Sequence, residues 1–170
     1  MISAAPLILT LQIDEVAFTY FNNLRKQHFP PQINYLDAHV TLFHHLPADL
    51  AITQLLETVA VRQAAFMGQV SEVIKLGRGV AFKLQSEELK QIHGYLQKQW
   101  LDWLSPQDRQ GFRPHITVQN KVTPDTAQTL FTQLVNAFTP FSFQSIGLSL
   151  WEYQGGPWLK IKDYPFSALK

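Results

Sequence analysis

Residues 37–47 read DAHVTLFHHLP, and residues 113–122 read RPHITVQNKV. Each stretch contains a histidine, an apolar residue, a threonine and a second apolar residue, at positions 39–42 and again at 115–118. Alternate side chains of a β-strand face opposite ways, so each stretch predicts a strand with a polar pair on one face and an apolar pair on the other. We expect the apolar pairs to anchor the strands in the core and the polar pairs to face a shared groove.

The two stretches occupy equivalent places in a repeated order of predicted elements. The helix that opens at Ala48 after the first stretch and the helix that opens near Pro124 after the second lie at the same offset as the histidines. A shared period indicates a duplicated unit. We therefore predict an α+β fold of duplicated strand–helix units in two lobes with approximate twofold symmetry, forming a single domain over residues 1–170.

Capping residues and prolines define the other predicted elements. The predicted strands cover 6–13, 38–46, 66–85 with a turn at 77–79, 114–121 and a final hairpin around Gly155–Gly156. Helices are predicted after Asp14, ending at Pro30, over 48–64, after Ser86, and after Thr123.

Composition narrows the class of protein. The 170 residues are 46% hydrophobic and 16% charged, and they contain no cysteine, so disulfides and thiolate metal sites are excluded. No secretion signal or membrane-length apolar run is evident, and we expect a cytoplasmic protein. The formal net charge of +1 argues against a protein that coats long nucleic acid and leaves a short or terminal nucleic-acid segment as a ligand.

The polar pairs suggest a specific chemistry. Imidazole exchanges protons near neutral pH, so one histidine can take a proton from an attacking water while the other gives a proton to a leaving oxygen. The threonine hydroxyls can donate hydrogen bonds to oxygens that gain negative charge in the transition state. Phosphodiester cleavage between His39 and His115, with Thr41 and Thr117 as donors, fits this set without a metal.

The paired motifs His39-Val40-Thr41-Leu42 and His115-Ile116-Thr117-Val118 resemble those of the 2H phosphoesterase superfamily, which includes 2′-5′ RNA ligase-like proteins and cyclic nucleotide phosphodiesterases. The resemblance covers nearly the whole chain. It implies a bilobal α+β fold with a cleft between two largely antiparallel sheets.

This resemblance also implies an activity, a substrate and site residues. It implies a hydrolase that opens the 2′,3′-cyclic phosphate of an RNA 3′ end or a small nucleotide, needs no cofactor and typically leaves a 2′-phosphate. His39 and His115 become the acid–base pair, and Thr41 and Thr117 become donors to phosphate oxygens. Our initial assignment takes His115 as base and His39 as acid.

Several neighbouring residues are candidates for contacting the substrate. Phe43 shares the strand parity of His39 and is predicted either to stack on a base in the groove or to be buried against a helix. Trp151 and Tyr153, with Trp158, flank the Gly155–Gly156 turn and are predicted to form a base-binding wall or to pack the hairpin. Arg113 is a candidate phosphate contact.

The remaining histidines are predicted to be structural. By parity, His45 could reach the groove while His44 points the other way, and His93 and His28 belong to helices.

Three functional hypotheses remain open on the sequence alone. The first is the cyclic phosphodiesterase, and the second is an RNA- or nucleotide-binding module that does not turn over its ligand. The third is a metallohydrolase, although the sequence offers few side chains that could converge on a metal ion as its ligands. Ligation to 2′-5′ linked RNA is an alternative activity of the first hypothesis. We expect a monomer without a membrane contact or an obligate protein partner.

Overall fold

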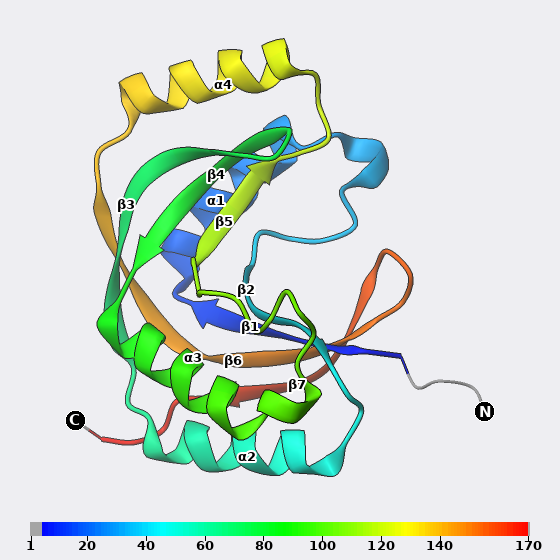
Figure 1. Cartoon of the computed structure of the whole chain (residues 1–170). Helices are drawn as coiled ribbons and strands as arrows, with labels where there is room; N and C mark the ends of the chain where they lie inside the picture. The colour runs from blue at the N-terminus through cyan, green and yellow to red at the C-terminus, as the bar shows by residue number, and fades with distance from the viewer. Residues whose placement is uncertain (1–4, 170) are drawn as a thin grey trace.

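A computed structural model describes residues 5–169 (Figure 1). Its strands are β1 (Leu7–Ile13), β2 (Val40–Leu46), β3 (Phe66–Leu76), β4 (Gly79–Gln85), β5 (His115–Gln119), β6 (Phe141–Tyr153) and β7 (Trp158–Pro165). Its helices are α1 (Glu15–His28), α2 (Leu50–Arg62), α3 (Glu87–Gln99) and α4 (Pro124–Ala137), with 3₁₀ turns η1 (Pro31–Ile33) and η2 (Leu101–Trp103). These bounds confirm the helices and strands predicted from the sequence.

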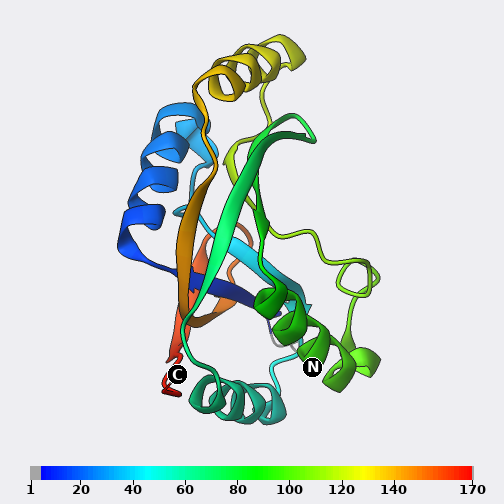
Figure 2. The same cartoon turned by 90° about the vertical axis from the view of Figure 1, so that its left-hand side faces the viewer.

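All seven strands form one antiparallel sheet in the order β2-β1-β6-β3-β4-β5, with β7 also paired to β6. The long strand β6 belongs to two groups of strands. Its residues 141–145 pair with β3, and its residues 145–152 pair with β1. The sheet is strongly bent along this strand (Figures 1 and 2). The α+β class is confirmed, but the two sheets expected from the sequence are one continuous sheet, because β6 joins them.

The helices cover the sheet in a crossed arrangement. Helix α1 follows β1 but packs Phe21 edge-to-face on Phe82 of β4. Helix α3 follows β4 but stacks His93 on Phe43 of β2. Each half of the sheet is therefore covered partly by a helix that follows a strand of the other half, which ties the two halves into one core.

Local sequence explains where the helices begin. Asp14, Asp49, Ser86 and Thr123 each cap a helix by accepting a hydrogen bond from a backbone N–H in its first turn. Gly79 allows β5 to approach β4, because a Cβ there would overlap the backbone of Gln119. No helix within residues 5–169 has the length and apolar character needed to cross a membrane.

Strand β2 contains irregularities that the sequence did not predict. Its register against β1 shifts between Thr10↔Thr41 and Leu9↔Phe43, and again before Leu7↔Leu46. Each shift reverses the alternation of side chains that parity assumes. Phe43 therefore joins the core, is 0% exposed and stacks on His93 of α3, so of its two predicted places the buried one against a helix is found and the groove position is not.

A stack of three rings secures this bulged segment. His93 lies parallel to Phe43, with ring centroids 4.6 Å apart, and parallel to Phe112, with centroids 3.9 Å apart. Its Nε2 donates to the Leu42 carbonyl oxygen at 3.2 Å. Burial lowers the pKa of His93 from 6.5 to about 4, so the ring is neutral at pH 7.

This low pKa predicts acid sensitivity of the fold. The folded state disfavours protonation of His93, so its contribution is present above pH 6.5 and is lost as the pH falls towards 4. In His93→Phe, the decrease in the free energy of unfolding between pH 7 and pH 4.5 should be about 2 kcal/mol smaller than in wild type. Urea denaturation at both pH values measures this difference. An equal decrease in the two proteins would contradict it.

Candidate active site

His39 lies directly before β2, and a backbone contact fixes its ring. The Nδ1 atom of His39 lies 2.7 Å from the Asp37 carbonyl oxygen. A carbonyl oxygen only accepts, so Nδ1 carries the proton and the neutral ring keeps a free lone pair on Nε2. Asn22 holds this segment from α1, since its amide donates to Asp37 and accepts from the Ala38 backbone N–H.

The second histidine has the same arrangement. His115 is the first residue of β5, and its Nδ1 lies 2.8 Å from the carbonyl oxygen of Arg113. In both motifs the acceptor is the carbonyl of the residue two positions earlier, so both rings are held in the same tautomer. Both Nε2 atoms are thus available to exchange a proton with a ligand.

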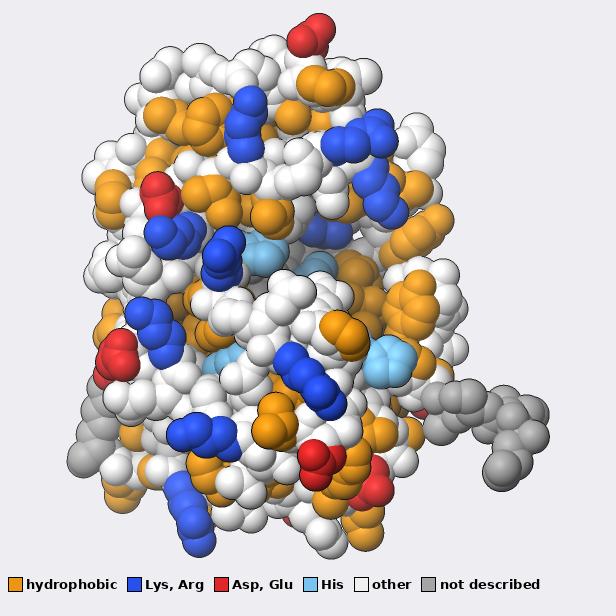
Figure 3. All heavy atoms as spheres, in the orientation of Figure 1, with side chains coloured by type: hydrophobic (Ala, Val, Ile, Leu, Met, Phe, Trp, Pro, Cys, Tyr) orange, Lys and Arg blue, Asp and Glu red, His pale blue; other side chains and the backbone are white. Residues whose placement is uncertain are grey.

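Buried and half-buried residues alternate along both motifs, as strand geometry predicts. Val40 and Leu42 of the first motif and Ile116 and Val118 of the second are buried in the core. Thr41 and Thr117 are only half-buried, as are both histidines. Figure 3 shows imidazole side chains in a hollow on one face of the molecule, with Lys and Arg side chains around it.

The environment of His39 favours its neutral form. Burial lowers the pKa of His39 from 6.5 to about 4, and the charges of Arg25, His115 and His44 lower it further against the hydrogen bond to Asp37. His115 is therefore close enough for its charge to act on His39. This effect indicates that the two motifs, far apart in sequence, lie near each other in the fold.

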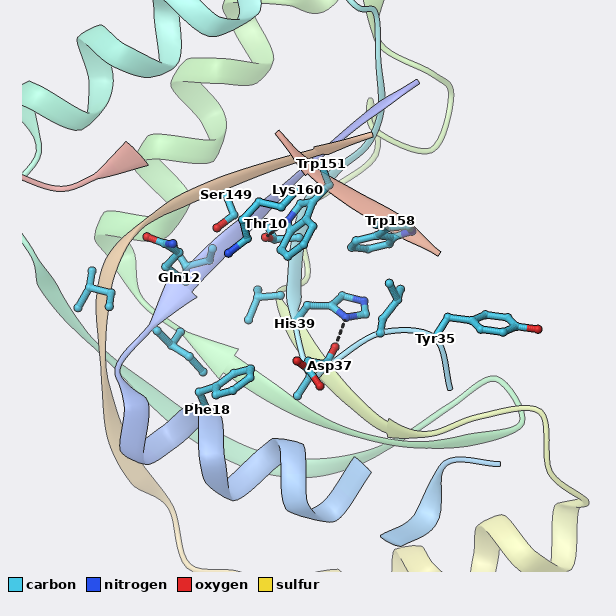
Figure 4. Close-up of a pocket in the computed structure, with 16 residues that line it drawn as sticks. Thr10, Gln12, Phe18, Tyr35, Asp37, His39, Ser149, Trp151, Trp158 and Lys160 are labelled. Atoms are coloured by element: carbon cyan, nitrogen blue, oxygen red, sulfur yellow. Dashed lines mark hydrogen bonds between the residues drawn. The ribbon is translucent and has the colours of Figure 1, made fainter. Parts of the chain in front are cut away.

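A cavity of about 410 Å³ extends from His39 along the half of the sheet formed by β1, β6 and β7. The Trp158 ring lies 4.7 Å from the His39 ring between centroids, and the Trp151 ring lies 6.2 Å from that of Trp158. Tyr35 and Phe18 also line the cavity. In Figure 4 the rings of Trp151 and Trp158 lie on one side of His39 and Phe18 lies on the other, while the Tyr35 ring points away from His39. Aromatic walls of this kind suit an unpaired nucleobase.

A row of polar side chains crosses four strands on this side of the sheet. Thr41 pairs with Thr10, Thr10 with Ser149, and Ser149 with Asp163. The Thr10 hydroxyl accepts from Trp151 Nε1 at 2.8 Å, and the Ser149 hydroxyl donates to Asp163 at 2.6 Å. Thr10 and Ser149 line the cavity, so the row provides a polar surface that leads away from Thr41.

The other predicted contact residues differ in their positions. Trp151 lines the cavity, whereas Tyr153 does not and is 42% exposed. Arg113 contributes its carbonyl oxygen to His115, and its exposed guanidinium has no hydrogen-bond partner among residues 5–169. Its contact with phosphate remains a prediction.

Parity also misplaced the two histidines that follow Phe43. His44, rather than His45, is the one whose charge acts on His39. Its ring nitrogen Nδ1 lies 3.0 Å from Asp108 Oδ1, and its side chain is 44% exposed. The bulges in β2 explain this reversal, because they insert residues that strict alternation does not count.

Asp108, in the loop before β5, was not identified from the sequence. It accepts hydrogen bonds from the backbone N–H groups of both His44 and His45 and from Ser105. Burial alone would raise the pKa of Asp108, but the hydrogen bonds from His44 and His45 outweigh it and lower the pKa below its usual range. A loop carboxylate without a motif carries no sequence signal for this role.

Arg25 was also missed, although the helical pattern contained a signal. It follows Phe21 by four residues and therefore lies on the buried face of α1, where it is only 4% exposed. Within residues 5–169, no group of three or more His, Cys, Asp or Glu side chains is arranged to hold a metal ion.

The sequence matches a family model described as the 2′-5′ RNA ligase superfamily over residues 13–157. The chain belongs to this superfamily. The match confirms the resemblance to 2H phosphoesterases that the paired motifs suggested. No curated protein matches the chain in sequence.

Solved structures share the fold of this 2′-5′ RNA ligase superfamily member. TT0787 of Thermus thermophilus aligns with a TM-score of 0.65 and 14% identity, over 97% of this chain and all of that one. E. coli LigT complexed with 3′-AMP aligns with a TM-score of 0.59 and 18% identity, over 97% of this chain and 99% of that one. E. coli LigT complexed with phosphate aligns with a TM-score of 0.57 and 18% identity, over 98% and 99% of the two chains.

The role of Asp108 can be tested by its removal. Asp108→Ala leaves the backbone N–H groups of His44 and His45 without their acceptor, so we expect the free energy of unfolding to fall by about 2–4 kcal/mol. Denaturant titration measures the loss. Asp102→Ala in the exposed η2 turn is the matched control and should change stability by less than about 0.5 kcal/mol. Equal stability of the two variants would rule out this role.

Proposed function

We propose that this protein hydrolyses the 2′,3′-cyclic phosphate of an RNA 3′ end or of a small nucleotide, using His39 and His115 as an acid–base pair without a metal. The observation that carries the proposal is the matched setting of the two rings. Each Nδ1–H is held by a carbonyl oxygen two residues earlier, at 2.7 Å and 2.8 Å. Each Nε2 is then free to take up or release a proton.

The reaction consumes one water. One Nε2 accepts a proton from the water as its oxygen attacks phosphorus. The bond between phosphorus and one ribose oxygen breaks, and that oxygen takes a proton from the other Nε2. Cleavage at the 3′ oxygen leaves a 2′-phosphate. The hydroxyls of Thr41 and Thr117 donate to the phosphoryl oxygens, whose negative charge grows in the transition state.

The low pKa of His39 favours the opposite of the roles predicted from the sequence, in which His115 was the base and His39 the acid. A ring with a pKa of about 4 is almost entirely neutral at pH 7, which suits a base in the free enzyme. As an acid, only about one molecule in a thousand would carry the required proton at that pH. We therefore take His39 as the base that activates water and His115 as the acid that protonates the leaving oxygen.

The cavity beside His39 supports a nucleotide as the substrate. Trp151, Trp158 and Tyr35 offer aromatic faces, and Thr10 and Ser149 offer hydroxyl groups. LigT, which shares the fold, has been crystallised with 3′-AMP and with phosphate. Ligation is the second candidate activity because the family model bears its name, and it would replace the attacking water by an RNA hydroxyl at the same two imidazoles.

Hydrolysis of the four 2′,3′-cyclic nucleotides in the presence of excess chelator tests the proposal. We expect turnover by wild type, and a decrease of at least about 100-fold in His39→Ala and in His115→Ala, because each loses one proton transfer. His45→Ala, an exposed histidine beside the site, is the control and should retain activity. Full activity in either single variant would refute the site. Loss with chelator would favour a metallohydrolase, and binding without turnover would favour a binding module.

The pH dependence of kcat/KM tests the low pKa on which the role of His39 as base rests. With His39 as the base, its neutral form persists in the free enzyme down to about pH 4, so kcat/KM should show no decline from this group between pH 7 and pH 5. If His39 instead kept an ordinary imidazole pKa of about 6.5, its neutral form would be lost and kcat/KM should fall as the pH drops from 6.5 to 5. Initial rates with one cyclic nucleotide at low concentration measure the profile.

A further inference from the structure

The guanidinium of Arg25 links the two motifs from the end of α1. Its Nη1 donates to the Thr117 carbonyl oxygen at 2.9 Å, within the second motif. Its Nε donates to the Leu36 carbonyl oxygen and to Asn34 Oδ1, both at 2.9 Å, in the segment that leads to His39. One side chain is thus hydrogen-bonded to backbone or side-chain atoms on both sides of the site.

The position of this link in the sheet gives it importance. Strands β2 and β5 stand at opposite ends of the strand order, so no ladder of sheet hydrogen bonds fixes the distance between them. His39 lies at the start of β2 and His115 at the start of β5. A direct contact across these two edges therefore has more effect on their separation than any single contact within the sheet.

The charge of Arg25 is also unusual for a buried group. Within residues 5–169 it forms no ion pair, and its hydrogen-bond partners are neutral oxygens. The guanidinium lies 4.0 Å from the Phe29 ring centroid. Burial lowers its pKa to about 10, against the opposing effect of Asp37. A buried cation without a carboxylate partner is costly for stability, so a packing role alone would be served better by an apolar residue.

We propose that Arg25 is a positioning residue of the active site, whose planar fork sets the separation of the two histidine motifs. This inference rests on the proposed function only for its kinetic test. The fork geometry matters because a guanidinium offers several donors at fixed angles, whereas a lysine ammonium offers a single point of attachment. The same side chain places a permanent positive charge near His39.

Several charged or titratable groups, Arg25 among them, face His39 and determine how easily it is protonated. They are Arg25 from α1, His115 from β5, His44 from β2, Asp37 in its own segment and Lys160 of β7 across the cavity. Removal of the Arg25 charge leaves the others in place and should make protonation of His39 easier. Replacement of Arg25 by lysine keeps the charge and should leave that protonation nearly unchanged.

Two substitutions therefore separate the fork from the charge. In Arg25→Lys we expect kcat to fall at least about tenfold with KM within about threefold of wild type, because misplaced groups lose contacts that form only in the transition state. In Arg25→Gln we expect a similar or larger loss of kcat, together with a rise in the pKa of His39. Arg62→Gln, at the exposed end of α2, is the matched control and should match wild type.

Histidine NMR spectra provide a readout that does not require turnover. The chemical shifts of the His39 and His115 imidazoles at one fixed pH should change in Arg25→Lys, because the rings are displaced, and should not change in Arg62→Gln. If wild type proves inactive on cyclic nucleotides, the proposed function fails, but this comparison still tests the link. If Arg25→Gln does not fold, the link is tested with Arg25→Lys and with Asn34→Ala, which removes one acceptor of the Arg25 guanidinium. Folded variants with only a lower melting temperature, wild-type kcat and unshifted imidazoles would overturn the inference.

Discussion

The placement of the two histidine motifs depends on a single strand that serves both halves of the sheet. Strand β6 is paired with β3 through residues 141–145 and with β1 through residues 145–152. Backbone hydrogen bonds fix both pairings in register, so the two halves cannot separate without the breaking of a ladder. The bend of β6 thereby sets the angle at which the half that ends in β2 meets the half that ends in β5. Contacts between the edge strands β2 and β5 then adjust their separation within the range that β6 allows.

Within this frame, two similar histidines experience different surroundings. Identical carbonyl contacts hold both rings in one tautomer. Only His39 adjoins the aromatic cavity, where Trp158 covers its ring. Burial of an imidazole penalises its charged form and lowers the pKa of His39 to about 4. A neutral ring suits a step that accepts a proton, which is the role proposed for His39.

The sequence predicted most of the architecture, since the signals for it are local. Capping residues such as Asp14 and Thr123 mark helix starts, and the apolar partners of the two histidines mark strand faces. Prediction failed where side-chain order depends on pairing with another strand. Strand parity could not decide between the groove and the core for Phe43 and placed His44 away from the groove, because β2 is bulged against β1 and a bulge is a property of two strands together. The role of Asp108 likewise depends on a loop that meets β2 only after folding.

The charge of Arg25 adds to the burial that disfavours a proton on His39. The guanidinium is buried with neutral oxygens as its hydrogen-bond partners. An anionic phosphate between the two motifs would balance this cation and stabilise a proton on either imidazole. Ligand binding would then raise the pKa of His39 towards the range in which it can hold the proton taken from water. A buried cation that is costly for stability would in this way favour phosphate binding and the uptake of a proton by His39.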